Sequence, residues 1–285
     1  MPTIKNRLRQ LLQPRKVRIT LPDYFEVSDT LELLTERGRD QIALQLAAQG
    51  WSSFETPVPG IIAAAAQQVE GVFFDVGANT GLYALLAACA SQRLAVHAFE
   101  PYPPALDALQ KNIALNDLRD RIRVSPAALG DSPGRQPLYI PLQNHGLMES
   151  SASLSAGFKE EHSGTIEIDV TTIDVYMAGL QSTPLGLLKI DVESTEHQVL
   201  SGGLATIARD RPMIVLEVLH LADHGWLDAF CRENQYRIFS LHPDRMAPRN
   251  AVQFHGDAWN QCFCPLEKLP LLTDCAKRAG LDFRG

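Results

Sequence analysis

The sequence predicts an α/β fold in which a mostly parallel β-sheet is covered by helices on both faces. From Gly71 onward, short apolar runs typical of buried strands alternate with helical stretches. A glycine-containing turn joins the first of these strands to the first helix. The chain has 285 residues, 45% of them hydrophobic, so it can bury a large core without a disulfide or a structural metal.

Residues 1–69 are predicted to form a basic segment followed by a helical extension. Apolar side chains such as Leu31, Leu34 and Leu46 are spaced at helical intervals, which predicts a helix over residues 29–49. Prolines and a glycine at positions 57–60 then interrupt the chain. An alanine-rich stretch at 61–69 predicts a second, shorter helix.

Residues 70–285 are predicted to form the main domain. Its first helices are expected at 80–90 and 103–115, and Pro103 suits the first turn of a helix. Strands are predicted at 72–76, 94–99, 121–128, 185–190, 213–218, 236–240 and 261–265.

An insertion at about 131–170 interrupts this alternation. Two short alternating runs, 138–140 and 166–170, predict strand-like arms. Between them lies a polar stretch that contains Ser150, Ser151, Ser153 and Ser155. Loops of this length in compact domains are usually functional, so we expect residues 143–164 to form a lid over the strand ends.

The distribution of charge excludes broad nucleic-acid binding. The formal net charge is −7, yet residues 1–18 hold six basic side chains and no acidic one, so the rest of the chain is strongly acidic. The basic N-terminus is interpreted as a solvated segment. The alternative is a peripheral contact with an anionic membrane surface.

The cysteines and the apolar runs predict a cytoplasmic protein. Five scattered cysteines form neither a disulfide framework nor a metal-binding motif. The basic start is not followed by the apolar region of a signal peptide, and no run is long enough to be a transmembrane segment.

The strongest motif is the turn DVGANTG at residues 75–81. Glycines at 77 and 81 allow the backbone to approach a ligand, and the helix that follows offers N–H groups to an anionic group. Glu100 ends the next strand about 20 residues later, where an acid can accept hydrogen bonds from ribose hydroxyls. Asn79 replaces the second glycine of a dinucleotide fingerprint, so the motif predicts another adenosine-containing cofactor. The alternative is a tight strand-to-helix turn that Asp75 caps.

Four segments together resemble the FkbM family of S-adenosylmethionine-dependent methyltransferases. They read DVGANTG, HAFEPYP, AALGD and LLKIDVESTEHQVLSGG, and the resemblance covers about residues 70–220. It implies a class I methyltransferase (Rossmann-like) sheet of about seven strands, the last of them antiparallel. It also implies S-adenosylmethionine as the cofactor and the methylation of hydroxyls on sugars, glycolipids or natural products.

The resemblance implies which residues contact the cofactor. They are Asp75, Gly77, Ala78, Asn79, Thr80, Gly81, Glu100, Pro101, Ala128, Asp131 and Asp191. The chain departs from the family at Ser194-Thr195, where the family usually has glycine followed by a small residue. This departure concerns the side of the site that would face the methyl acceptor.

Methyl transfer to a hydroxyl requires alignment and is helped by a general base. Asp191 ends the fourth strand and is the best-placed candidate, with Glu193, Glu217 and His220 as the other candidate catalytic residues. Glu196 is interpreted as an acid that stabilises the first turn of a helix. No metal site is assigned, although Asp191 with Glu193 or Glu217 offers oxygen ligands for Mg²⁺.

The sequence therefore predicts an O-methyltransferase that uses S-adenosylmethionine and acts on a small-molecule or glycan acceptor. The acceptor pocket is expected from residues 1–69, 140–165 and 220–260, the least patterned parts of the chain. The alternatives are an N-methyltransferase acting on a small molecule and a cofactor-binding scaffold without catalytic activity.

Overall fold

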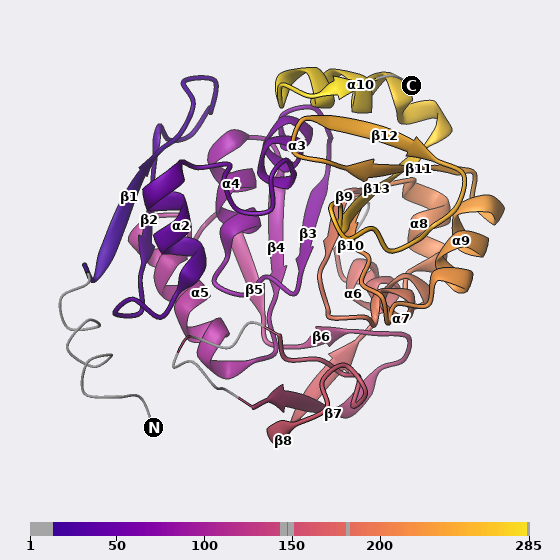
Figure 1. Ribbon diagram of the computed structural model, residues 1–285, viewed down its shortest axis with the longest axis horizontal. Coiled ribbons are helices and arrows are strands. Elements are labelled where there is room, and N and C mark those ends of the chain that lie inside the picture. Colours follow the sequence, from indigo (N-terminus) through magenta and orange to yellow (C-terminus); the bar gives the residue numbers. More distant parts are fainter. Residues whose placement is uncertain (1–13, 143–146, 148–150, 181–182, 284–285) are drawn as a thin grey trace.

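A nine-stranded sheet forms the centre of the computed structural model, which describes residues 14–142, 147, 151–180 and 183–283 (Figure 1). The strand order is β14-β12-β11-β13-β10-β9-β3-β4-β5. The strands are β3 (Val72–Val76), β4 (Ala95–Phe99), β5 (Ile122–Ser125), β9 (Leu185–Ile190), β10 (Met213–Glu217), β11 (Tyr236–Leu241), β12 (Arg245–Arg249), β13 (Asn260–Pro265) and β14 (Asp282–Phe283).

Seven of these strands have the topology predicted from the sequence. β5, β4, β3, β9 and β10 pair in parallel, and β13 runs antiparallel between β10 and β11. The prediction of a class I methyltransferase (Rossmann-like) sheet with its last long strand antiparallel is therefore confirmed. β12 and β14 extend one edge beyond the predicted seven.

Helices cover both faces of the sheet, as predicted. Side chains alternate along β3, so that Phe73 packs in one buried cluster and Phe74 in the other. The first cluster includes α3 (Val58–Ala66), α4 (Leu82–Ala90), α5 (Pro103–Leu115) and α10 (Leu269–Arg278), and the second includes α6 (Ile173–Ala178), α7 (Glu196–Ser201), α8 (Leu204–Asp210) and α9 (His224–Glu233). A short 3₁₀ helix, η1 (Leu266–Lys268), precedes α10.

The predicted helix over residues 29–49 is wrong in its first half. Residues 30–34 form β2 (Thr30–Leu34), which pairs antiparallel with β1 (Lys16–Thr20). Leu31 and Leu33 are buried while their neighbours are partly exposed, which is the two-residue period of a strand. Only the second half is helical: α2 (Gln41–Gln49) begins after Asp40, whose carboxylate accepts a hydrogen bond from Ala43 N.

The N-terminal hairpin is fixed to the main domain through α5. Asn116 accepts a hydrogen bond from Glu32 N at 2.8 Å and donates one to Glu32 O at 2.7 Å, while Asn112 accepts from Leu34 N at 2.9 Å. Within the hairpin, Lys16 and Arg18 both pair with Glu32. The remaining basic residues of the predicted N-terminal segment, apart from Arg15, lie outside the described residues.

The insertion forms a small sheet of its own, next to one end of the central strands in Figure 1. β7 (Gly134–Pro141) and β8 (His162–Thr171) pair antiparallel, and β6 (Ala128–Leu129) pairs in parallel with β8. These strands contain the two predicted arms. Part of the expected lid, residues 143–146 and 148–150, lies outside the described residues.

Candidate active site

The glycine turn lies directly against the end of β9. Gly77 has φ +77°, and a Cβ at this position would lie 1.8 Å from the Asp191 carbonyl oxygen, so only glycine fits. The turn is held by the end of β4, because Gly77 N and Ala78 N both donate to Phe99 O at 3.0 Å. The N–H groups of the turn are therefore used within the protein rather than left for an anionic ligand.

Asp75 caps the helix that follows the turn. Its Oδ2 accepts a hydrogen bond from Ala84 N at 2.8 Å, and burial raises the pKa of this carboxyl to about 6. Thr80 is also buried, and its carbonyl oxygen accepts from Asn112 Nδ2. Gly81, with φ +97°, begins α4 in the left-handed conformation. These three predicted cofactor residues shape the turn and do not line a pocket.

Glu100 holds the opposite side of the turn. Its Oε2 accepts from Asn79 N at 2.7 Å and its Oε1 accepts from Tyr102 N at 2.8 Å. Burial raises the pKa of Glu100 to about 7, while the two backbone donors oppose this shift. Each carboxylate oxygen keeps a second acceptor position for a ligand hydroxyl.

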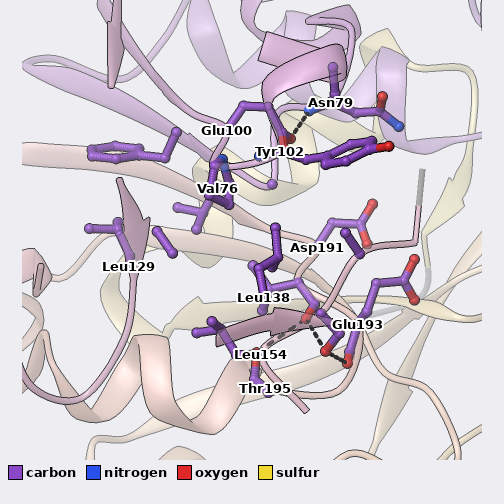
Figure 2. A pocket seen from close by; sticks show the side chains of 18 residues that line it. Val76, Asn79, Glu100, Tyr102, Leu129, Leu138, Leu154, Asp191, Glu193 and Thr195 are labelled. Carbon is purple, nitrogen blue, oxygen red and sulfur yellow. Dashed lines mark hydrogen bonds between the residues drawn. The ribbon is translucent and has the colours of Figure 1, made fainter. Parts of the chain in front are cut away.

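Glu100 and Asn79 line a pocket at the carboxyl ends of β3, β4 and β9, which we call the first pocket (Figure 2). This edge is where open α/β sheets bind ligands. Figure 2 shows the Asp191 and Glu193 carboxylates on one side of the pocket and the apolar side chain of Leu129 on the other. The lining is completed by Val76, Gly77, Phe99, Pro101, Tyr102, Ala105, Ala128, Leu138, Ala152, Ser153, Leu154, Val192 and Thr195.

The insertion supplies one wall of the first pocket. Leu138 comes from β7, and residues 152–154 lie within the serine-containing stretch. Ser153 donates a hydrogen bond to Glu193 O at 2.9 Å and is 2% exposed. Asp131, also in the insertion, is exposed and lines neither of the two pockets described here.

A larger cavity of about 180 Å³ adjoins the first pocket. We call it the second pocket. The two pockets share Gly77, Asn79, Asp191 and Glu193. Its other wall comes from the N-terminal extension, through residues 39–42 and 54–55. Residues 1–69, predicted to help form an acceptor pocket, thus contribute to the lining of the second pocket.

A buried lysine organises the second pocket. Lys189 is 1% exposed, and its ammonium group donates to Asp191 Oδ2 at 2.7 Å and lies 4.8 Å from the centre of the Tyr83 ring. Burial opposes the charge on Lys189, but the carboxylates of Asp191, Glu55 and Asp75 raise its pKa above the usual value. The Tyr83 hydroxyl donates to Glu55 Oε2 at 2.6 Å.

Three of the four candidate catalytic residues meet in the second pocket. Asp191, Glu193 and Glu217 line it together. Burial and the Asp191 charge raise the pKa of both Glu193 and Glu217. His220 is exposed beyond β10, with its ring centre 6.0 Å from that of Phe254, and lines neither pocket.

The structure gives no support for a magnesium site. Within the described ranges, no three His, Cys, Asp or Glu side chains come together in an arrangement that would hold a metal ion. Nor does any helix in those ranges have the length and apolarity needed to cross a membrane.

Glu55, Tyr83 and Lys189 were not among the residues predicted to form the site. Lys189 has a signal in the sequence, since it is the one charged residue in an apolar run that reads as a buried strand. Glu55 has no such signal. It reaches the pocket because the chain between α2 and α3 folds across the strand ends.

Comparisons with known proteins find similar sequences and a similar solved structure. The family model described as "Methyltransferase FkbM domain" matches residues 75–238. The 31-O-demethyl-FK506 methyltransferase FkbM of Streptomyces tacrolimicus is 31% identical over 165 residues, which cover 46% of this chain and 58% of that protein. Methyltransferase sdnD of Sordaria araneosa is 29% identical over 151 residues, covering 45% of this chain and 58% of that protein.

The chain thus spans less than two thirds of these curated relatives. A crystal structure of methyltransferase FkbM from Methylobacillus flagellatus KT aligns with a TM-score of 0.44 and 17% identity, over 80% of this chain and 53% of that one. The family model alone matches more than half of the sequence. The chain therefore belongs to the FkbM methyltransferase family.

Proposed function

We propose that this protein transfers a methyl group from S-adenosylmethionine to a hydroxyl of a sugar, glycolipid or natural product. The observation that carries the proposal is the pair of adjoining pockets, which share Asn79, Asp191 and Glu193. A methyl donor in the first pocket and an acceptor in the second would meet at these shared residues. Such positioning supplies a large part of the rate enhancement in transfer reactions.

The donor groups of the first pocket fit this cofactor. Glu100 has acceptor positions free for two ribose hydroxyls, and Leu129 and Leu138 offer an apolar surface to an adenine ring. Asn79 Oδ1 is buried and has no hydrogen-bond partner among the described residues. An unpaired buried oxygen destabilises the folded protein, and a ligand that donates a hydrogen bond to Asn79 Oδ1 would remove this penalty.

Bound S-adenosylmethionine supplies a methyl group activated by its positively charged sulfur. The protein's part is to hold the acceptor hydroxyl in line with that methyl group and to accept its proton. Asp191 suits the second task. Lys189 donates a hydrogen bond to its Oδ2, which leaves Oδ1 for the acceptor hydroxyl.

The relatives support transfer to oxygen and a natural-product acceptor. One carries the name 31-O-demethyl-FK506 methyltransferase, and it is 31% identical over the matched region. Five buried cysteines without a disulfide fit the predicted cytoplasmic location.

The first test measures binding and transfer separately. Calorimetry with S-adenosylmethionine should show binding, and mass spectrometry across sugars, glycolipids and polyketides should show the gain of one methylene unit. Binding without transfer to any acceptor would favour the inactive scaffold, and methylated amines would favour an N-methyltransferase.

The second test concerns Asp191. Asp191→Asn keeps the shape and removes the charge, so it should lower the methyl-transfer rate by about 10²–10⁴ and leave the fold largely unchanged. Asp244→Asn, at an exposed turn residue, is the matched control. If Asp191→Asn transfers methyl groups at the wild-type rate, the proposed role passes to Glu217 or His220, or alignment alone suffices.

A further inference from the structure

The second pocket holds more carboxylates than cations. Asp40, Glu55, Asp191, Glu193 and Glu217 line it, whereas the cationic lining residues are Lys189 and Arg39. This imbalance bears on which acceptor the pocket can bind, because charges buried beside a ligand must be neutralised.

Both cations already have partners. Lys189 donates to Asp191, and Arg39 pairs with Glu36 at 3.4 Å on the surface. Asp40 caps α2. Glu55, Glu193 and Glu217 form no ion pair with a described residue, although Lys189 lowers the pKa of Glu55 and Glu217 and Lys159 lowers that of Glu193 from a distance.

Glu217 points to a ligand most directly. It is 8% exposed, it lines the cavity, and none of the described residues forms a hydrogen bond with its carboxylate. Glu55 approaches from the opposite wall, where Tyr83 fixes one of its oxygens. The two acids therefore belong to different segments, the extension and the end of β10, and both line the same space.

Deepening the proposed function, on which this inference rests, we propose that the second pocket binds an acceptor that carries a protonated amine near the reacting hydroxyl. Glu217 and Glu55 bind the amine, and Asp191 remains with Lys189 for the hydroxyl. A phosphorylated or carboxylated acceptor is rejected, because its negative charge would lie beside several acids with no unpaired cation of the described lining to bind it. Burial and the neighbouring carboxylates raise the pKa of Glu55 and Glu217, and the more distant charge of Lys189 opposes this rise only in part.

The extension supplies part of this selectivity. Residues 39–42 and 54–55 lie outside residues 75–238, the part that matches the family model. Glu55 is thus a specificity-determining residue from outside the matched segment, whereas Asp191 and Glu217 lie within it.

The test uses three sugars that differ mainly in charge: glucosamine, glucose and glucose 6-phosphate. Each is titrated by calorimetry into the full chain saturated with S-adenosylhomocysteine. We expect glucosamine to bind about tenfold more tightly than glucose, and glucose 6-phosphate more weakly than either. Binding of S-adenosylhomocysteine is measured first, and its absence would contradict the proposed function rather than the amine preference.

Two variants assign the preference to the acids. Glu217→Gln and Glu55→Gln should each reduce the affinity for glucosamine about tenfold and leave the affinity for glucose and for S-adenosylhomocysteine unchanged. Glu233→Gln, on the exposed side of α9, is the control that should change none of these. Equal binding of the three sugars, no binding of glucosamine, or undiminished glucosamine affinity in both folded variants would overturn the inference.

Discussion

The residue that departs from the family pattern also has an unusual backbone conformation. Ser194 has φ +77° and follows Glu193 at φ +59°, the left-handed region in which glycine is favoured. Its hydroxyl is buried without a hydrogen-bond partner among the described residues. A glycine would fit this position better, and the strain lies next to an acid that lines both pockets.

Ser194→Gly should therefore stabilise the protein. Relief of the left-handed strain and loss of the unpartnered hydroxyl outweigh the extra backbone entropy of glycine by about 1 kcal/mol. Thermal unfolding should show an increase of about 2–4 °C. Ser163→Gly, at an exposed position of β8, should instead lower the melting temperature. A lower melting temperature for Ser194→Gly would contradict this explanation.

Glu100 gives the residue-level prediction for the cofactor. Glu100→Ala removes the acceptor positions expected to bind the ribose hydroxyls, so affinity for S-adenosylmethionine should fall by about 1–3 kcal/mol. Calorimetry on the folded variant measures this, with Glu233→Ala as the control. Unchanged cofactor affinity would refute the assignment of the ribose to Glu100.

At the scale of elements, the sequence predicts the central strands well and the peripheral strands poorly. β3 and β9 are continuous apolar runs, because both of their faces are covered. β12 reads RMAPR, with no apolar alternation, and β2 combines adjacent leucines with an acid. Pairing with a neighbouring strand, which the sequence does not display, makes these two segments extended.

The candidate site also divides into residues that local sequence predicts and residues that only the tertiary fold brings there. The turn at residues 75–81 and the acids at 100 and 191 follow from local motifs at strand ends. Glu55 and Leu138 enter the pockets through the tertiary path of the extension and the insertion. Their roles depend on contacts between distant segments, so periodicity and motif spacing do not reveal them.

The insertion should contribute to cofactor affinity through β7. Leu138→Ala removes an apolar side chain that is 2% exposed and lines the first pocket. The affinity for S-adenosylmethionine should therefore fall about tenfold. This loss is smaller than the full effect of burying a leucine side chain, about 1.5–3 kcal/mol. Ile166 pairs with Leu138 across β7 and β8 but does not line the pocket. Ile166→Ala is therefore the control for loosening of the small sheet, and equal losses in both variants would argue against a direct contact.

At the scale of the whole molecule, acids are concentrated at the carboxyl ends of the central strands, around the two pockets. The pKa of Glu100 and that of Glu196 are each raised to about 7, mainly by burial. Acids with raised pKa stabilise the folded state below their unfolded pKa, and this contribution is lost as pH rises through the folded pKa. Burial lowers the pKa of His97 to about 4, so this residue makes the folded state more stable as pH rises. Its effect ends at about pH 6.5, where the unfolded histidine has lost its proton.

Stability should therefore decrease on the alkaline side of neutrality. At about pH 6.5 these acids still hold protons in the folded state, whereas they are already ionised in the unfolded state. As pH rises to about 8 the folded state loses these protons, so the free energy of unfolding should fall by about 1–3 kcal/mol. Denaturant unfolding at several pH values measures this. Glu100→Gln has no proton to lose at this position, so it should flatten the curve in part, because Glu193 also titrates in this range, whereas Glu233→Gln, at an exposed acid, should leave the curve unchanged. If the free energy of unfolding stays constant or rises over this range, Glu100 and Glu196 are already ionised in the folded protein at about pH 6.5. Glu100 would then accept hydrogen bonds from the ribose hydroxyls without first losing a proton.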